Sequence, residues 1–396
     1  MSFDIALSGI QAINNQLNTI SNNIANSGTY GFKSGRANFS SMYAGTQPTG
    51  TEIGSLTQSI GLSGGVLNTG RSLDAAINGR GFFVSRDSTG AMLYSRVGIF
   101  STDKSGYLVD SAGRKVQGYG VVPGSTTLGP MGDLKVPTGQ IPAQASTKMD
   151  YVGNLSADWT VPPNAAFSPT DSLSYNMSKL SVVHDSLGAQ HTVTQYFAKN
   201  AGGGINVHYT VDGGAPLGTT TTLTFNTSGQ LTAPAAPVAL ALTAAGAAAA
   251  LTVNLDYTGT TQFAGEATTT TNSADGYASG TFTGVELAGN GSLIAQYTNG
   301  QKQTVGTVAL ATFPDEGSLT AVNDTSWTTS NSSGAPLYFT PGSGMAGSLT
   351  TSALEQSNVD ITSELVGLMT SQRNYQANSK VISTESAMLQ SLMQAL

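Results

Sequence analysis

Two uninterrupted heptad patterns, one at each end of the chain, constrain its fold more than any other feature. Near the amino terminus, apolar residues recur at alternating spacings of three and four: Phe3, Ala6, Ile10, Ile13, Leu17, Ile20 and Ile24. A helix with this spacing carries one narrow apolar stripe, which it buries against another helix. The pattern therefore predicts a helix that begins near Ser2 and stops at Asn26-Ser27-Gly28, because glycine commonly ends helices.

The second heptad pattern runs from about residue 360 to residue 396. One of its two rows is entirely apolar: Ile361, Leu368, Tyr375, Ile382, Leu389 and Leu396. The companion row contains Leu365 and turns polar at Gln372, Ser379 and Ser386. A helix of this length spans about 50 Å, which is more than a globular core usually needs.

We expect the two terminal helices to pair as a coiled coil and to bury their stripes during self-assembly. The alternative is that each helix packs on its own domain as an ordinary amphipathic element. The residues expected to take part in self-assembly are Phe3, Ile10, Ile13, Leu17, Ile20, Ile24, Ile361, Leu365, Leu368, Tyr375, Ile382, Leu389 and Leu396.

The polar face of the first helix is almost uncharged. Within residues 1–32 the only charged side chain is Asp4, and the outer positions are mostly Asn, Gln, Ser and Thr. A helix lying on a membrane would carry Lys or Arg on this face. Two interpretations remain open: the neutral faces line an aqueous channel, or they form hydrogen-bonded contacts between helices.

Between the ends, the apolar periodicity changes to two, which is typical of strands. Runs such as 82–84, 92–94, 107–109, 180–183, 192–197, 293–297 and 305–310 are separated by turns rich in Asp, Asn and Gly. The predicted fold class is therefore mainly β with α-helical termini. We expect two antiparallel β domains, the outer one inserted in the inner one.

Composition sets the expected domain boundaries. Four prolines punctuate residues 123–142, and residues 200–301 contain no Lys or Arg. We predict a helical domain from residues 1–28 and 358–396, and an extended connecting segment at 29–72. An inner β domain follows from residues 73–145 and 282–357, with an inserted outer β domain at 146–281 in which 268–280 is expected to be a loop.

Charge and cysteine content exclude several classes of protein. Only 16 residues are basic and the net charge is −7, whereas nucleic-acid binding depends on clustered Lys and Arg. The chain has no Cys, which excludes disulfides, thiolate metal sites and thiol nucleophiles. No basic residue precedes Lys33, unlike a secretory signal. The uncharged stretch at 238–255 is interrupted by polar residues, so we expect no membrane insertion.

The sequence offers no recognisable catalytic machinery. The three histidines are His184, His191 and His208, and the first two flank a predicted turn, where we expect exposed positions and no metal site. Residues 61–65 match G-x-S-x-G but lack the strand and helix that this motif requires. We therefore predict no enzyme activity, no catalytic or metal-binding residues and no cofactor.

Several linked runs resemble the signatures of bacterial flagellar rod and hook proteins. They are residues 21–34 (SNNIANSGTYGFKS), 73–83 (LDAAINGRGFF), 94–100 (YSRVGIF), 347–349 (GSL), 353–360 (ALEQSNVD) and 372–378 (QRNYQAN). Linked motifs over residues 1–120 and 285–396 are a stronger signal than one short pattern. The signature residues are Asn22, Asn23, Ala25, Asn26, Gly31, Phe32, Lys33, Leu354, Glu355, Ser357, Asn358, Val359, Asp360, Gln372, Arg373 and Tyr375.

The resemblance implies a self-assembling structural subunit. Length and the inserted domain are similar to the hook members of the family, which form a flexible tubular joint that transmits motor torque to the filament and encloses the export channel. A distal rod subunit and, less well supported, a secreted β-rich adhesin are the alternatives.

Partners and location are also implied by the resemblance. The main partner is a second copy of the chain, followed by rod proteins at the proximal end and hook cap and hook–filament junction proteins at the distal end. Export through the flagellar type III apparatus, without a cleaved signal peptide, would place the protein in the extracellular flagellum. We expect its ends to be disordered before assembly and to fold upon it.

Overall fold

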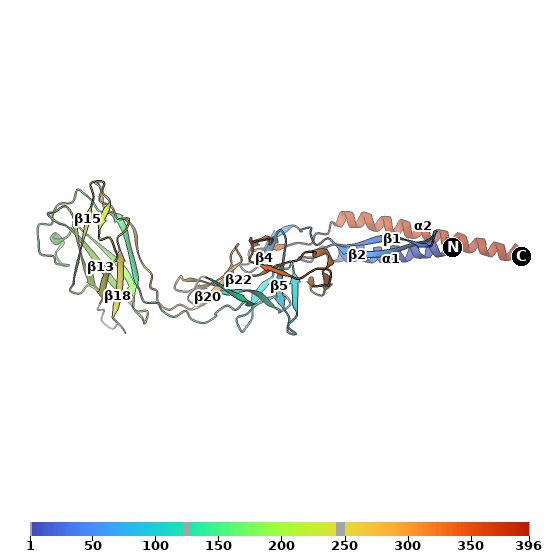
Figure 1. Cartoon of the computed structure of the whole chain (residues 1–396), viewed down its shortest axis with the longest axis horizontal. Helices are drawn as coiled ribbons and strands as arrows, with labels where there is room; N and C mark the ends of the chain where they lie inside the picture. Colours follow the sequence, from blue (N-terminus) through green and yellow to red (C-terminus); the bar gives the residue numbers. More distant parts are fainter. Residues whose placement is uncertain (1, 122–126, 243–249, 396) are drawn as a thin grey trace. The chain divides into compact units, whose positions relative to one another are not determined.

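The chain folds into two units, described by a computed structural model over residues 2–121, 127–242 and 250–395. The first unit comprises Met1–Thr138, Gly284–Gln296 and Lys302–Leu396, and the second comprises Gly139–Thr283 and Tyr297–Gln301. Strands dominate between one helix at each end of the chain (Figure 1). The predicted fold class, mainly β with helical termini, is confirmed.

The two terminal helices pair with each other in the first unit. Helix α1 covers Ser2–Ala25 and helix α2 covers Ile361–Ala395. Asp360 caps the start of α2, because its carboxylate accepts hydrogen bonds from Thr362 N at 2.9 Å and from Ser363 Oγ at 2.7 Å.

The segment that we expected to be an extended connection, 29–72, contains a long antiparallel hairpin that packs on α1. Its strands are β1 (Gly35–Ala44) and β2 (Gln47–Gln58), and Gly45 in the turn has a φ of 62°. The sequence did not reveal these strands because few of their residues are buried, so no apolar alternation marks them. Contact with α1 supports the pair, since an isolated two-stranded sheet is only marginally stable.

The inner β structure of the first unit is centred on a 13-stranded sheet with the main order β20-β21-β22-β9-β5-β6-β25-β24. Phe82, Tyr94, Phe313 and Trp327 form its aromatic core cluster. The strands of this sheet are β5 (Phe82–Arg86), β6 (Met92–Ser95), β7 (Phe100–Thr102), β8 (Leu108–Asp110), β9 (Lys115–Val121), β10 (Leu128–Asp133), β20 (Phe282–Leu287), β21 (Ser292–Tyr297), β22 (Lys302–Val308), β23 (Leu310–Thr312), β24 (Thr320–Val322), β25 (Ser326–Thr328) and β26 (Leu337–Phe339).

Two short strand pairs attach the carboxyl-terminal part of the first unit to its amino-terminal part. Strand β27 (Ser348–Thr351) pairs with β4 (Ala75–Asn78), and β28 (Ala353–Glu355) pairs with β3 (Val66–Asn68). Both pairs are antiparallel and join segments far apart in the sequence. The strand that leads into α2 is therefore anchored before the helix begins.

The second unit contains two sheets that share one core. One sheet has the order β17-β18-β11-β19, and the other has β12-β13-β14-β15-β16. Buried Tyr209 and Tyr257 are linked by their hydroxyl groups at 3.0 Å within the core, and Tyr257 also donates to Gln195 Oε1 at 2.8 Å. The strands are β11 (Lys148–Asn154), β12 (Met177–His184), β13 (Gln190–Lys199), β14 (Ile205–Val211), β15 (Pro216–Phe225), β16 (Leu231–Ala233), β17 (Val238–Leu242), β18 (Leu251–Asp256) and β19 (Thr268–Ala274). Two 3-10 turns, one in each unit, cover Ser172–Ser174 and Glu316–Ser318.

Two expectations about the second unit were wrong. Its sheets are not entirely antiparallel, because β11 pairs with β18 in parallel while its other edge pairs with β19 in antiparallel fashion. Residues 268–274, expected to be part of a loop, form β19, whose Thr-rich sequence carries little apolar alternation. The stretch at 238–255 contributes strands β17 and β18, and its residues 243–249 lie outside the described residues. Among the described residues, no helix combines the length and apolar character needed to cross a membrane.

Candidate self-assembly surface and buried junction

The contact between α1 and α2 is antiparallel and close. Asn23 Nδ2 donates to Glu364 Oε1 at 2.8 Å, at one end of the contact. Gly367 lies against Ile20, where an added Cβ would be 3.4 Å from Ile20 Cδ1, and Gly9 lies against Asn378, where it would be 3.1 Å from Asn378 Nδ2. We call the contacting face of α2 the seam; it comprises six of its least exposed positions, Glu364, Gly367, Leu368, Ser371, Asn378 and Ile382. Most of the seam is therefore small or polar.

The structure places the predicted self-assembly residues unevenly. On α1, Ile13 and Ile20 are buried; Ile10, Leu17 and Ile24 are half-buried; Phe3 is exposed. On α2, Leu368 and Ile382 are half-buried, whereas Ile361, Leu365, Tyr375 and Leu389 are exposed. Leu396 lies outside the described residues.

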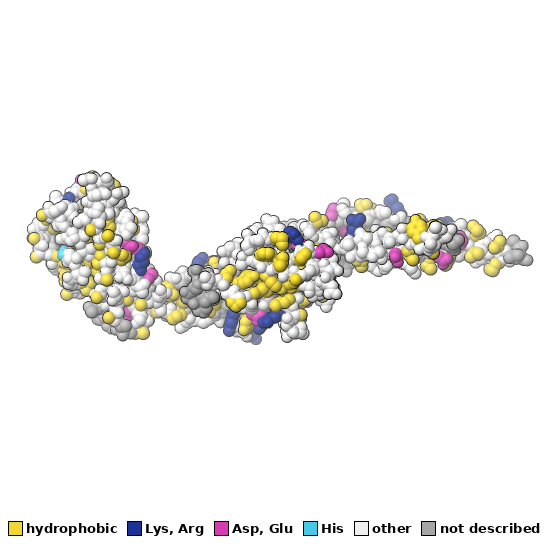
Figure 2. Space-filling model, viewed as in Figure 1, with side chains coloured by type: hydrophobic (Ala, Val, Ile, Leu, Met, Phe, Trp, Pro, Cys, Tyr) yellow, Lys and Arg dark blue, Asp and Glu magenta, His cyan; other side chains and the backbone are white. Residues whose placement is uncertain are grey.

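Most large apolar side chains of α2 are consequently left without cover within the chain. Figure 2 shows hydrophobic side chains on the surface near the two termini. We call this set the α2 apolar surface; it comprises Ile361, Leu365, Val366, Met369, Tyr375, Val381, Met388, Leu389, Leu392 and Met393, which are between 38% and 72% exposed. Large apolar side chains exposed in this number along one helix are typical of a site for protein association.

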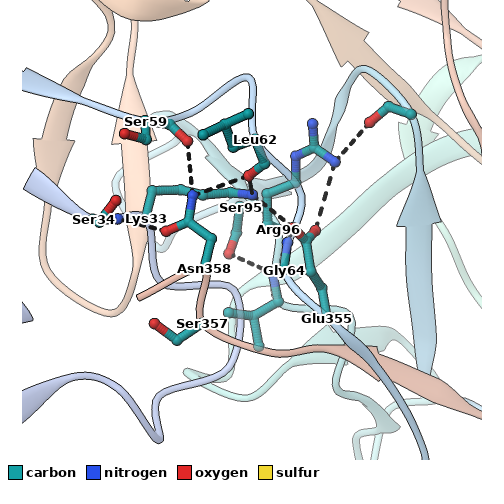
Figure 3. Close-up of polar contacts among 12 residues, drawn as sticks. Lys33, Ser34, Ser59, Leu62, Gly64, Ser95, Arg96, Glu355, Ser357 and Asn358 are labelled. Carbon is teal, nitrogen blue, oxygen red and sulfur yellow. Dashed lines mark hydrogen bonds and ion pairs between the residues drawn. The ribbon is translucent and has the colours of Figure 1, made fainter. Parts of the chain in front are cut away.

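The signature segments at 31–33 and 354–358 meet in a buried junction at the base of the helices (Figure 3). Lys33 Nζ donates to Glu355 Oε1 at 2.6 Å and to the carbonyl oxygen of Leu62 at 2.6 Å. Neither side chain of this ion pair is more than 1% exposed. The Gly64 N–H also donates to Glu355 Oε1, at 3.0 Å.

Arg96 is the third charged member of the junction. Its Nη1 lies 3.6 Å from Glu355 Oε2 and donates to the carbonyl oxygen of Gly79 at 2.9 Å. Its guanidinium carbon lies 5.2 Å from the centre of the Phe82 ring, a cation–π distance. Within the part of the chain that the structure describes, Glu355 is therefore the only carboxylate in direct contact with two buried cations.

Burial dominates the electrostatics of both cations. It lowers the pKa of Lys33 below its usual range, although the hydrogen bond from Lys33 to Glu355 opposes this effect. Burial likewise lowers the pKa of Arg96, against the attraction of Glu355 and Glu316. The pairing thus compensates only part of the desolvation cost, as is usual for buried ion pairs.

Asn358 ties the junction to the chain that enters the hairpin. Its side-chain Nδ2 donates to the carbonyl oxygens of Ser59 at 2.9 Å and Leu62 at 3.0 Å, and its Oδ1 accepts from Ser34 N at 2.7 Å. Gly31 N donates to the carbonyl oxygen of Glu355 at 2.8 Å, and Gly31 has a φ of 67°, which favours glycine. The junction therefore fixes where both helices leave the β structure.

The remaining signature residues have mixed environments. Asn23 is buried and also bridges to Gly35, donating to its carbonyl and accepting from its N–H at 2.8 Å in both cases. Leu354 is buried, and Asp360 is the cap of α2. Asn26, Phe32, Ser357 and Val359 are half-buried, whereas Asn22, Ala25, Gln372, Arg373 and Tyr375 are exposed.

The histidine expectations need correction. His191 is buried rather than exposed, with its Nδ1 2.8 Å from Asp212 Oδ2 and its Nε2 3.5 Å from Asp185 Oδ2. The hydrogen bond to Asp212 raises the pKa of His191 despite burial. His184 is half-buried and pairs in register with Gln190. Within the described ranges, no group of three or more His, Cys, Asp or Glu side chains is placed to hold a metal ion.

Sequence reasoning missed the seam and Arg96. Heptad counting assigns the largest apolar residues to the helix contact, whereas close approach here depends on Gly9 and Gly367. Arg96 was part of a signature run but not of the predicted site. The pairing of strand 353–355 with strand 66–68 would have indicated that Glu355 lies in the buried junction. This pairing is not visible in either segment alone.

Four protein-family models match successive parts of the chain. The flagella basal body rod protein model matches residues 3–33, and the flagellar hook protein FlgE/F/G D1 domain matches 76–157. The flagellar basal body protein FlaE D2 domain matches 154–277, and the flagellar basal body rod FlgEFG protein C-terminal model matches 350–395.

The chain is also similar to whole proteins from several bacteria. Flagellar hook protein FlgE of Salmonella typhimurium is 36% identical over 403 residues, and that of Escherichia coli is 35% identical over 401 residues, with 99% of each chain covered. The Treponema pallidum protein of the same name is 31% identical, covering 98% of this chain and 97% of that protein. A crystal structure of Helicobacter pylori flagellar hook protein FlgE2 aligns with a TM-score of 0.54 and 13% identity, covering 73% of this chain and 100% of that chain, which supports the fold.

Proposed function

This chain belongs to the flagellar hook protein FlgE family, and from that membership we infer that it is a structural subunit of the bacterial flagellar hook. Hook proteins match 98% to 99% of the chain in these comparisons. That full-length agreement favours a hook subunit over a distal rod subunit or a secreted adhesin.

The observation that carries self-assembly is the α2 apolar surface. In one copy, the seam against α1 uses mostly small and polar residues, so most large apolar residues of α2 remain exposed. Full burial of one such side chain contributes roughly 1.5–3 kcal/mol. A second copy that covers this surface by a head-to-tail contact extends an open helix, because the rotation between copies need not close.

The finer roles of the parts are also proposals. The terminal helices, residues 1–28 and 358–396, would build the inner tube around the export channel, and the second unit would lie outside it in the polymer. Bending under motor torque requires contacts that exchange with water at little cost. Surfaces rich in Thr, Ser and Gly with few charges suit this role, since uncharged, water-mediated contacts can exchange partners with water in small steps.

Partners and location follow from the same proposal. The subunit would polymerise with copies of itself, contact rod proteins at one end, and contact hook cap and hook–filament junction proteins at the other. It would leave the cell through the flagellar type III export apparatus. The absence of Cys supports this route, because an unfolded exported chain then cannot form mispaired disulfides.

A charge placed on the α2 apolar surface tests self-assembly. Leu365 and Met369 are 46% and 50% exposed, so Leu365→Glu with Met369→Glu should leave the thermal unfolding of the monomer unchanged. The same variant should form no tubes in negative-stain electron microscopy, because its charges would be buried between copies. The matched control, Leu365→Met with Met369→Leu, keeps the surface apolar and should assemble.

Tubes of normal length from the glutamate variant would contradict the proposal. So would a wild-type protein that never polymerises under conditions where its relatives form hooks.

A further inference from the structure

The register of the two helices leaves the end of α2 unpaired with α1 over the described residues. Gly9 lies beside Asn378 and Ile20 beside Gly367, so each step forward along α1 matches one step back along α2. The same register sets Ser2, the first residue of α1, opposite Glu385. Residues 386–395 of α2 therefore extend beyond α1 by about 15 Å at 1.5 Å per residue. We call this segment the overhang.

The overhang continues the seam but changes its chemistry. At seven-residue intervals after Ser371 come Asn378, Glu385 and then Leu392, and Leu389 likewise follows Ile382. Met388, Leu389, Leu392 and Met393 are 55% to 72% exposed. No charged residue follows Glu385. The face that meets α1 along the rest of α2 thus becomes most apolar where α1 is absent.

A groove of suitable size lies elsewhere in the first unit, between α1 and the β1–β2 hairpin. Its volume is about 500 Å³, and its α1 wall runs from Asn15 to Asn23. The opposite wall includes Phe32, Ile53 and Leu56, and Leu56 is 68% exposed. The groove therefore combines an amide-rich wall with an apolar wall.

The dimensions of the groove and the overhang agree. The α1 wall is about 12 Å long, close to the length of the overhang. A helix segment 15 Å long and about 10 Å wide occupies roughly 1,200 Å³, more than twice the groove volume. The groove can therefore receive one face of such a helix while the other face, which carries Ser386, Gln390 and Gln394, stays outside.

Charge also favours this occupant. The last turn of α2 has no basic residue, so the partial negative charge of its carbonyl end is not compensated within the helix. Arg36 lines the groove and is exposed, and among the described residues it has no ion-pair partner. A helix carboxyl end in the groove would bring opposite charges together.

We propose that the overhang of one subunit docks in the groove of a second copy of the chain. The same chain cannot supply this contact, because its overhang leaves α1 at residue 2 whereas its groove begins at residue 15, about 20 Å away along the helix. Each copy thus offers the overhang at one end of the helix pair and the groove toward the other, an arrangement that extends without closing. The proposal rests on the proposed hook function and assigns one contact within it.

Cysteine cross-linking tests the contact directly, because the chain has no Cys. Subunits carrying Leu392→Cys are mixed with subunits carrying Leu56→Cys, polymerised and oxidised with copper phenanthroline. A disulfide forms only when the Cβ atoms come within about 3.5–4.5 Å. We expect covalent dimers from the mixed polymer, and none when Leu56→Cys is replaced by Leu187→Cys, an equally exposed leucine of the second unit.

A pair of introduced opposite charges supplies a second measurement that does not depend on thiol geometry. Leu56→Asp should raise the critical concentration for assembly about tenfold or more and leave monomer unfolding unchanged, since Leu56 is exposed in the monomer. Adding Leu392→Lys to Leu56→Asp should recover part of the loss. Normal polymers without dimers in the first experiment and without rescue in the second would overturn the docking proposal alone. Failure of the wild-type protein to polymerise would overturn the proposed function as well.

Discussion

Replacing Glu355 by Gln should destabilise the first unit more than replacing Lys33 by Met. Among residues 2–121, 127–242 and 250–395, Glu355 alone supplies a carboxylate in direct contact with Lys33 and Arg96, at 2.6 and 3.6 Å, and all three side chains are buried. Glu355→Gln leaves two buried cations without an anion, a change that costs about 3–5 kcal/mol. Lys33→Met leaves Glu355 with Arg96 and the Gly64 N–H, so the loss is that of one charge-assisted hydrogen bond, about 1.5–3 kcal/mol.

Urea unfolding followed by tryptophan fluorescence measures this difference. Trp327 is 2% exposed in the core of the first unit, and its Nε1 donates to Gln58 Oε1 at 2.7 Å. The other tryptophan, Trp159, lies in the second unit, so a Trp159→Phe background restricts the signal to the first unit. As a control, Arg86→Met removes a part-exposed ion pair with Asp133 and should cost about 1 kcal/mol or less.

The order of the two effects is the decisive result. If Lys33→Met were as costly as Glu355→Gln, the junction would not contain the excess of buried positive charge that the distances indicate. A loss below about 1 kcal/mol for Glu355→Gln would mean that water reaches the junction and screens its charges.

Three further changes test other parts of the fold. The hydrogen bond to Asp212 raises the folded-state pKa of His191, so protonated His191 stabilises the second unit below about pH 6.5, and this stabilisation is lost as the pH rises through the folded-state pKa. His191→Asn should remove this pH dependence from urea unfolding of the second unit. An unchanged pH profile in the variant would contradict the prediction. Asp360→Ala should lower the helicity measured by circular dichroism, whereas Asp360→Asn, which also caps helices, should preserve it; equal loss in both would argue against capping. Gly64→Ala should cost about 1–3 kcal/mol in the fluorescence assay, because its Cβ would lie 1.9 Å from the carbonyl oxygen of Gln356; a neutral effect would show that this backbone contact is loose.

The helices and many strands were predictable because their signals are local. A heptad spacing requires only the residues within it, and α1 and α2 begin and end within a few residues of the expected positions. The hairpin at 35–58 escaped prediction because polar, exposed strands lack alternation. The parallel pairing of β11 with β18 escaped it because two segments about a hundred residues apart meet in one sheet.

The candidate site was predictable only in part. The heptads identified α2 as an apolar helix, but not which of its faces α1 covers. Close packing selected small residues for that contact, and this left most large apolar residues outside. The signature segments could be recognised as important, yet nothing in either segment indicates that Lys33 and Glu355 form a buried pair.

By itself, the sequence determined the helical ends, the β-rich middle, the scarcity of charge and the resemblance to a family of tubular polymers, because each depends on neighbouring residues or on composition. Tertiary structure alone decided that Lys33 and Glu355, 322 positions apart, share one buried site with Arg96. It also decided that α2 extends past α1 with its apolar face uncovered. Both outcomes depend on how distant segments fit together in space, since packing distance and register between helices are not encoded in either helix alone.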